Sequence, residues 1–529
     1  MTKKIKRPVR AIDPNQQLSM FGDQALVLKE AIEKKTEKRR LAGFIDPDPE
    51  ELRINLIPLR EFLQSMEMQW VIELRDFIRS LDFTAFHAAY NLNGRPPYAP
   101  QAMLGLVLYG ILRGHSSLRE IELLARSDLG AMWISGGICP DHSIIGRFLT
   151  RHQELIGQDF FLQLTTQIVA ACRINPQFFA GDGTTIQAAA SRFHTITLEA
   201  AQLAQAQLRE QIEALEQQVQ QACDEEVSKK KSTRLARKLK QQHAMDAAVQ
   251  VGESRVNPIR HNVEKRATTL RLAKSEPESC VLKMKEGNYC PAYVASALTC
   301  DQRIIHGLHV DPSNELNAMK PMLEQAEVIN QAPATTLLLD SNYHRHEIAR
   351  LAAEKDINLL SPSNFQVRQA RENTWQEKFN KSKKQSKYDK SEFQYDRAGD
   401  VYICPNHQLL HPGGVQNRAN ERPHTAYRAG KQACESCPVR IHCTSAKNGR
   451  VIKRYQDDEH LENISQAMQQ PEAQALYNRR QGSVEPVFSS LKNTLKLRRF
   501  RRRGIASVTL EFSLYAMAHN LRRRAVLQG

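Results

Sequence analysis

The segment Thr335-Thr-Leu-Leu-Leu-Asp340 limits the possible folds more than any other stretch of the chain. Three consecutive leucines suit a strand that is buried on both faces, which is typical of sheets covered by helices on each side. The acid follows at the carboxyl end of the strand, where open α/β sheets bind ligands. Asp340 could also simply cap the helix expected over 347–355. With a further strand expected over 357–360, the pattern predicts the α/β class.

A second acid lies inside an expected strand over 177–186. Strand alternation places Asp182 in a row that is otherwise mostly apolar. The flanking Gly181 and Gly183 leave room for a ligand or another backbone to approach closely. The simpler interpretation is a Gly-Asp-Gly turn between two short strands. Asp182 is therefore a candidate site residue, with a structural alternative.

A third acid, Glu485, stands alone in a basic segment. Apolar residues recur at three- and four-residue spacing over 481–492, which predicts an amphipathic helix. Between 470 and 529 the chain has twelve Lys or Arg and three Glu, a balance of 12 − 3 = +9. A lone carboxylate in such a field suits a metal ligand beside a phosphate backbone. The alternative is a surface acid paired with neighbouring arginines.

Tyr477, Arg480, Glu485 and Lys492 resemble the signature around the third acid of insertion-sequence transposases of the DDE type. The resemblance implies an RNase H-like mixed sheet flanked by helices, and Asp182 lies in an Asp-Gly-Thr similar to the family's first aspartate. Asp340 corresponds to the second. One spacing departs from the family pattern, because four residues rather than three separate Arg480 from Glu485. The role of the arginine is therefore open between Arg479 and Arg480.

The activity that this resemblance implies is metal-dependent cleavage at the terminal repeats of an insertion element, followed by strand transfer into target DNA. Asp182, Asp340 and Glu485 would be the catalytic residues and would hold two Mg²⁺ or Mn²⁺ ions, which prefer oxygen ligands. Two alternatives remain open at this point. One is a catalytically inactive, zinc-containing DNA-binding protein, and the other is a metal-dependent nuclease without strand transfer.

The charge of the chain favours DNA as its partner. The formal net charge is +16, and no apolar stretch is long enough to span a membrane. No signal peptide is recognisable, so we expect a cytoplasmic, nucleoid-associated prokaryotic protein that acts as a homodimer or larger assembly on paired element ends. The predicted DNA-binding residues are Tyr477, Arg479, Arg480, Lys492, Arg498, Arg499, Arg501, Arg502, Arg503, Arg147 and Arg151.

One cysteine cluster stands out among the ten cysteines. Its members follow a Cys-x2-Cys pattern with one cysteine upstream and one downstream, namely Cys404, Cys434, Cys437 and Cys443. Four thiolates at this spacing can form a tetrahedral zinc site. A vestigial or iron-binding site and a set of unconnected thiols are the alternatives. A similar cluster precedes the third acid in a subgroup of the DDE transposases.

These features divide the chain into five expected regions: a basic flexible arm (1–55), a helical N-terminal DNA-binding domain (56–172), a first part of the catalytic domain (173–370) with a coiled-coil insertion (196–245), a linker with a zinc-ribbon-like cysteine cluster (371–455), and a second catalytic part with basic C-terminal helices (456–529). Helices are expected over 62–81, 101–112, 118–125 and 143–171 in the N-terminal domain, in which the middle helices could form a helix-turn-helix reader. The coiled-coil seam could pair within the chain or between two chains.

Overall fold

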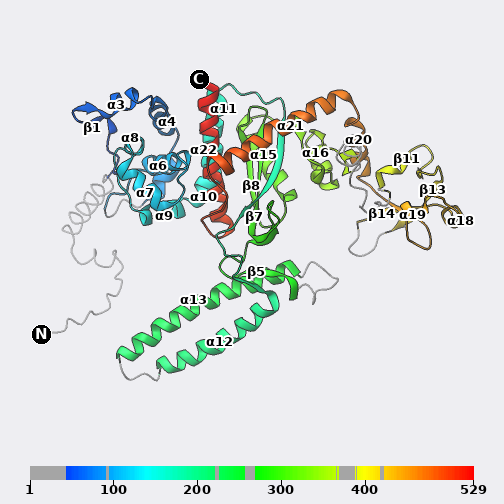
Figure 1. Ribbon diagram of the computed structural model, residues 1–529, viewed down its shortest axis with the longest axis horizontal. Helices are drawn as coiled ribbons and strands as arrows, with labels where there is room; N and C mark the ends of the chain where they lie inside the picture. Colours follow the sequence, from blue (N-terminus) through cyan, green and yellow to red (C-terminus); the bar gives the residue numbers. More distant parts are fainter. Residues whose placement is uncertain are drawn as a thin grey trace, which may run out of the picture. The chain divides into compact units, whose positions relative to one another are not determined.

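The computed structural model divides the chain into two compact units, residues 1–155 and 156–529 (Figure 1). It describes residues 43–90, 95–220, 225–256, 268–364, 366–367, 388, 390–416 and 422–528. The helix expected over 24–41 and most of the linker expected over 371–400 lie outside the described residues. We describe each unit by itself.

The first unit is helical. Its main elements are α3 (Leu59–Ser65), α4 (Gln69–Arg79), α5 (Thr84–Ala88), α6 (Pro100–Leu112), α7 (Leu118–Ser127), α8 (Leu129–Ser135), α9 (His142–Arg151) and α10 (Gln153–Leu155). The helix expected over 62–81 is two helices, because Glu67 adopts a left-handed conformation with φ 56° and ends α3. The short turn expected before α9 instead contains α8. Asp141 caps α9 as expected, accepting the Ile144 N–H at 2.8 Å.

A mixed sheet forms the centre of the second unit. Its strands are β3 (Phe179–Gln187), β6 (Cys280–Lys283), β7 (Tyr289–Cys300), β8 (Ile305–Asp311), β9 (Thr336–Leu338) and β10 (Asn358–Leu360). The order is β10-β9-β3-β7-β6, and β8 also pairs with β7. The strands β3, β9 and β10 run parallel, whereas β7 runs antiparallel to its neighbours. This arrangement agrees with the predicted α/β class.

Helices pack around this sheet: α11 (Phe161–Ala171), α15 (Met319–Asn330), α16 (His346–Glu354), α21 (Pro471–Ser489) and α22 (Ile505–Gln528). A π-helix, η2 (Ile156–Phe160), and α11 pack against α22. The first unit therefore ends at Leu155 rather than near residue 172. The side chain of Asn520 on α22 pairs with both backbone groups of Ile305, each at 2.9 Å, and so ties α22 to β8.

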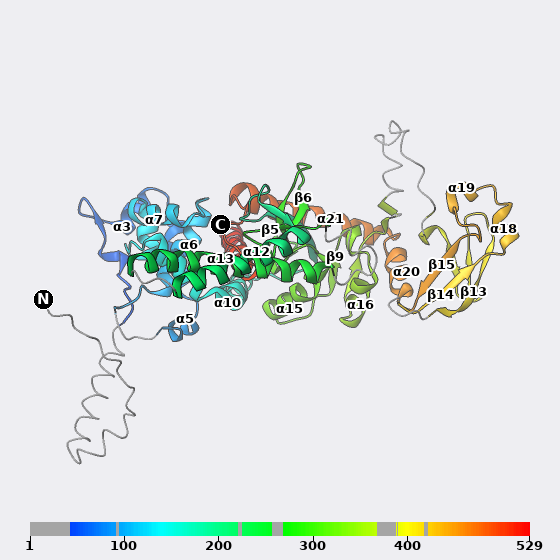
Figure 2. The same ribbon diagram turned by 90° about the horizontal axis from the view of Figure 1, so that it is seen from below.

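The coiled-coil insertion is an antiparallel hairpin of α12 (Leu198–Gln220) and α13 (Glu225–Val256), seen in Figures 1 and 2. The seam therefore pairs within the chain. The polar seam residue Gln205 donates a hydrogen bond to Asp246 Oδ1 at 2.6 Å, which satisfies its amide. At the base of the hairpin, β4 (Thr195–Thr197) pairs with β5 (Arg271–Ala273).

The cysteine cluster belongs to a second sheet, which we call the cysteine module. Its strands are β11 (Gln394–Asp396), β12 (Val401–Ile403), β13 (Leu409–Gln416), β14 (His424–Arg428) and β15 (Val451–Tyr455), all antiparallel. Two short helices, α18 (Lys431–Glu435) and α19 (Arg440–Cys443), connect β14 to β15. The helix α20 (Asp458–Ala467) then leads to α21. The composition of the segment did not predict this sheet.

Candidate active site

Two of the predicted acids lie level with each other at the ends of neighbouring strands. The parallel strands β3 and β9 pair with Phe179 opposite Leu337 and Ala180 opposite Leu338. Continuing this register by two residues places Asp182 level with Asp340. Level residues of adjacent parallel strands lie on the same face, and such strands are about 4.8 Å apart. The backbone register therefore brings these two carboxylates to one edge of the sheet.

The two glycines beside Asp182 have different roles. Asp182 lies within a continuous strand rather than in a turn. A Cβ at Gly181 would lie 2.8 Å from the side chain of Leu339, so this glycine makes room for the apolar core. A Cβ at Gly183 would lie 2.8 Å from Oε2 of Glu315. The close approach expected from the sequence is thus made by side chains of the chain itself.

Helix α21 lays Arg480 against the first acid. The guanidinium Nη2 lies 3.4 Å from Asp182 Oδ1 and donates to the Gly181 carbonyl at 3.3 Å. Its buried Nε has no hydrogen-bond partner among the described residues. The neighbouring Arg479 instead contacts Gln177 and lies over the Phe178 ring. Arg480, rather than Arg479, is therefore the arginine beside the acids.

The electrostatics of this edge reflect partial burial. Burial raises the pKa of the Asp182 carboxyl, while Arg480 lowers it and Asp340 raises it further. Burial also raises the pKa of Tyr477, one helical turn before Arg480, and the carboxylates of Asp340 and Asp182 act on it in the same direction. Tyr477 and Arg480 therefore share the face of α21 that is turned toward the two aspartates.

Lys492 reaches the same strand from the end of α21. Its ammonium donates to Thr184 Oγ1 at 2.5 Å and to the Thr185 carbonyl at 3.3 Å. Burial lowers the pKa of Lys492. The helix is irregular here, since Pro486 lacks an N–H and a π-helix, η6 (Ser490–Thr494), follows. Arg303 Nε donates to the Gly482 carbonyl at 3.0 Å, the group that Pro486 leaves without its helical partner.

The third predicted acid has a different environment. Glu485 is exposed, and its Oε2 accepts a hydrogen bond from Gln481 at 3.2 Å. It follows Arg480 by five residues, which is a rotation of about 140° around an α-helix. Arg480 and Lys492 thus contact β3, whereas the recorded partner of Glu485 lies on its own helix.

A carboxylate that the sequence analysis did not single out lies beside the two aspartates. Glu315 precedes the short 3-10 helix η3 (Leu316–Ala318). Burial raises the pKa of its carboxyl, and the charges of Asp340 and Asp182 raise it further. The only sequence signal for this contact was Gly183, which marked a close approach without identifying the approaching residue.

The donor chemistry of this edge fits a divalent cation that prefers oxygen, because Asp182, Asp340 and Glu315 offer carboxylates. In the described part of the chain, however, no three His, Cys, Asp or Glu side chains are gathered so that they could hold a metal ion. The carboxylate of Asp182 is paired with Arg480 instead. The backbone thus sets the positions of these acids, while their side chains do not form a coordination shell.

The predicted basic segment after α21 is anchored by a buried acid. The Glu511 carboxylate accepts the backbone N–H groups of Arg501, at 3.0 and 3.1 Å, and of Arg502, at 2.9 Å. Arg499 donates to the carbonyls of Ala188 and Ala190, so its guanidinium is used within the fold. Side chains exposed to solvent are those of Arg498, Arg499, Arg501 and Arg503, whereas Arg502 is half-buried.

In the first unit, the two predicted DNA-binding arginines are exposed on α9. Arg151 lies over the Tyr90 ring, with 4.7 Å between the guanidinium carbon and the ring centroid. Arg147 is exposed. Helix α9 is joined to α7 by Glu122, which contacts the backbone N–H of His142 at 3.0 Å and its ring Nδ1 at 2.7 Å.

The four clustered cysteines do not form the predicted zinc site. Their charges act on one another, since those of Cys434, Cys404 and Cys437 each raise the pKa of Cys443. Within the described residues, however, no metal-binding group of three or more ligands occurs. The cysteines lie on α18, on α19 and in turns, and these short elements do not direct the thiols to a common point.

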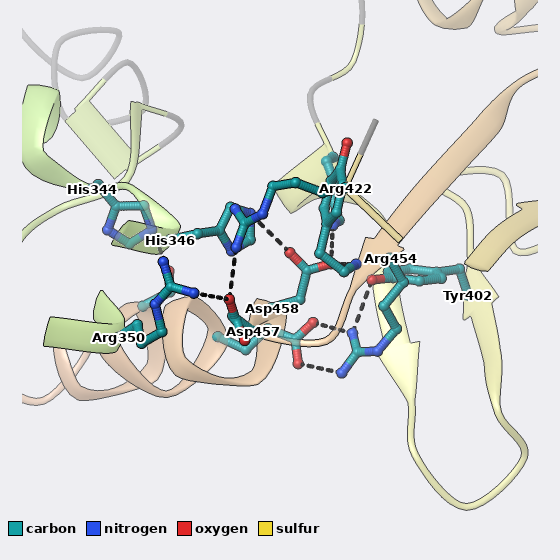
Figure 3. A network of polar contacts seen from close by, with 12 residues as sticks. His344, His346, Arg350, Tyr402, Arg422, Arg454, Asp457 and Asp458 are labelled. Carbon is teal, nitrogen blue, oxygen red and sulfur yellow. Dashed lines mark hydrogen bonds and ion pairs between the residues drawn. The ribbon is translucent and has the colours of Figure 1, made fainter. Parts of the chain in front are cut away.

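A polar network joins the cysteine module to helix α16, as Figure 3 shows. The buried carboxylate of Asp458 accepts the Tyr455 N–H at 2.8 Å, pairs with Lys390 and lies 3.3 Å from His346 Nε2. The neighbouring Asp457 pairs with Arg422 at 2.7 Å. The module is thus attached to the helix that follows Asp340.

Comparison with known families gives two matches. Residues 55–151 match the family described as Transposase domain (DUF772), and residues 403–525 match the family described as Transposase DDE domain. The second match includes Glu485 but neither aspartate. No curated protein and no solved structure matches the chain significantly. None of the described helices is both long and apolar enough to cross a membrane. From its two matched regions, the chain is a member of the DDE transposases of insertion sequences.

Proposed function

We propose that this chain cleaves DNA at the terminal repeats of its insertion element and transfers the cut ends into target DNA, using Mg²⁺ or Mn²⁺. The observation that carries the proposal is the parallel register of β3 and β9, which sets Asp182 level with Asp340 beside the helix that bears Arg480 and Glu485. We also infer from the family that the sheet is RNase H-like.

Asp182 and Asp340 would hold the metal, with Glu485 as the family's third acid. Two bound ions would activate the attacking oxygen and stabilise the leaving oxygen of the scissile phosphate. Arg480 would bind a DNA phosphate, because its Nε is buried and has no hydrogen-bond partner among the described residues. Lys492 would add positive charge on the same strand. The exposed arginines after α21 would bind the DNA backbone in a salt-dependent manner.

The test is cleavage and strand transfer on DNA that carries the element ends, with Mg²⁺ or Mn²⁺. We expect Asp182→Asn, Asp340→Asn and Glu485→Gln each to slow cleavage about 10³-fold or more, since metal stabilisation of the transition state contributes several kcal/mol. End binding, measured by gel shift, should persist in all three variants.

Glu472→Gln is the matched control, because Glu472 is an exposed acid in the first turn of the same helix α21. It should cleave as the wild type does. If the wild type binds the ends but does not cut them, the chain is a DNA-binding protein without this activity. If it cuts the ends and does not join them, it is a nuclease, and the strand-transfer part of the proposal is wrong.

A further inference from the structure

The connection between β8 and α15 is held rigidly where it passes the two aspartates. Asp311 Oδ1 accepts the backbone N–H groups of Ser313, at 2.8 Å, and Asn314, at 2.7 Å. Asn314 Oδ1 in turn accepts the Leu316 N–H at 3.0 Å. These bonds fix the backbone on both sides of Glu315. The position of this acid is therefore set by the loop and not by its side chain alone.

The side chain of Glu315 lies against the strand that carries Asp182. A Cβ at Gly183 would lie 2.8 Å from Glu315 Oε2 and 3.2 Å from its Cβ. A real Cβ essentially never makes contacts under 3.0 Å, so any other residue at 183 would displace the carboxylate. The Asp-Gly pair thus provides an acid and the space for a second acid next to it.

Asn342 connects Glu315 to the other aspartate. Its backbone N–H donates to Asp340 Oδ1 at 2.9 Å, and its side chain hydrogen-bonds to Glu315. Glu315 therefore contacts the residue after Asp182 on one side and a partner of Asp340 on the other. Three carboxylates from three separate connections of the sheet are held within mutual electrostatic range.

We propose that Glu315 is a ligand of the same divalent ion as Asp182 and Asp340, in addition to the acid on α21. This inference rests on the proposed function, because it takes the two aspartates as metal ligands. Repelling carboxylates held together by the backbone gain stability from a cation between them. To bind it, the Asp182 carboxylate must exchange its contact with Arg480 for the ion.

The test is Mn²⁺ binding by the full-length protein without DNA, measured by the electron paramagnetic resonance signal of free Mn²⁺. Glu315→Gln keeps the volume of the side chain and an oxygen that can accept from Asn342, but it removes the charge. We expect its Mn²⁺ affinity to fall about 10- to 100-fold or more, the range found even for residues that only support metal ligands. Raised Mn²⁺ should restore part of its cleavage activity.

Glu324→Gln is the control, because Glu324 is an exposed acid on α15. It should bind Mn²⁺ as the wild type does. Glu315→Asp retains the charge with a shorter reach and should lie between the wild type and Glu315→Gln, which provides a second test if Glu315→Gln does not fold by thermal melting.

The outcomes separate the two proposals. If Asp182→Asn loses Mn²⁺ binding while both Glu315 variants bind like the wild type, Glu315 is not a ligand and the proposed function stands. If Asp182→Asn and Asp340→Asn also bind Mn²⁺ like the wild type, the metal site itself is misassigned, and both proposals are overturned.

Discussion

The acid edge of the central sheet and the cysteine module were both predicted as metal sites, but the structure treats them differently. At the acid edge, the register of β3 and β9 sets two carboxylates level before any ion is present. In the cysteine module, the thiols lie on short helices and turns and do not converge. A strand ladder fixes side-chain position over many residues, whereas short connecting helices leave it to local packing.

The module has other means of holding its structure. Its buried apolar cluster consists of Phe393, Tyr402, Leu410, Tyr427 and Ile452. The network around Asp457 and Asp458 then attaches it to α20 and α16 (Figure 3). We therefore expect the two regions to respond independently to substitution, pH and chelation.

The largest effect that separates the two regions is expected for Asp458→Asn. This substitution leaves the Lys390 ammonium without its buried anionic partner, and breaking a buried pair costs about 4 kcal/mol. Hydrogen exchange should accelerate in β14 and β15, while the amides of β3 and β7 stay protected. Mn²⁺ affinity should not change.

Asp396→Asn is a suitable comparison, since Asp396 lies in β11 of the same module and is exposed. It should leave exchange in β14 and β15 near the wild-type rate. Faster exchange in β3 after Asp458→Asn would show that the two regions unfold together, which contradicts their independence.

A smaller effect is expected for pH, and it concerns the sheet region. Burial raises the pKa of Glu511 from 4.5 to about 7, although Arg501 and Arg502 N–H groups oppose the shift. Since the folded pKa is the higher one, the folded state holds its proton longer and stability falls as pH rises from about 4.5 to 7. The loss is up to about 3 kcal/mol.

Glu511→Gln removes this titration and keeps an oxygen that accepts the two N–H groups. The difference in unfolding free energy between variant and wild type should therefore grow in favour of the variant from pH 4.5 to 7. Using the difference cancels other groups, such as His519, whose pKa burial lowers to about 4. A difference that is constant with pH would show that Glu511 titrates normally.

The smallest effect is expected for zinc removal. Four thiolates that held a structural zinc would contribute on the order of 10 kcal/mol to folding. Because the structure gathers no such ligand set among its described residues and provides an apolar core instead, a zinc chelator should leave exchange in β11–β15 unchanged. Cys437→Ser should behave in the same way. Unfolding of the module by the chelator would instead show that the cysteines bind zinc.

The features that the sequence predicted well are those with a strong local pattern. The leucine run before Asp340 and the alternation around Asp182 identified the two strands, and three- and four-residue spacing identified α21 and the α12 seam. Their pairing follows from the general rule that parallel strands in α/β sheets bring their carboxyl ends together.

The features that were missed depend on contacts distant in sequence. Glu315 lies in a loop with no periodic pattern, and its importance comes from its contact with Gly183, more than a hundred residues earlier. The helix break at Glu67 depends on one residue in a left-handed conformation. The strands of the cysteine module are mostly short, and several alternate weakly between buried and exposed residues, so composition did not reveal them.

The α12–α13 hairpin also bears on how the sheet can form during folding. The strands β3 and β7 are neighbours in the sheet, yet the whole insertion lies between them in sequence. Because β4 pairs with β5, the chain leaves and re-enters the sheet region at nearly the same place. Once the hairpin has closed, β3 and β7 are joined by a much shorter effective loop, so their pairing costs less chain entropy. The insertion should therefore slow folding less than its length implies.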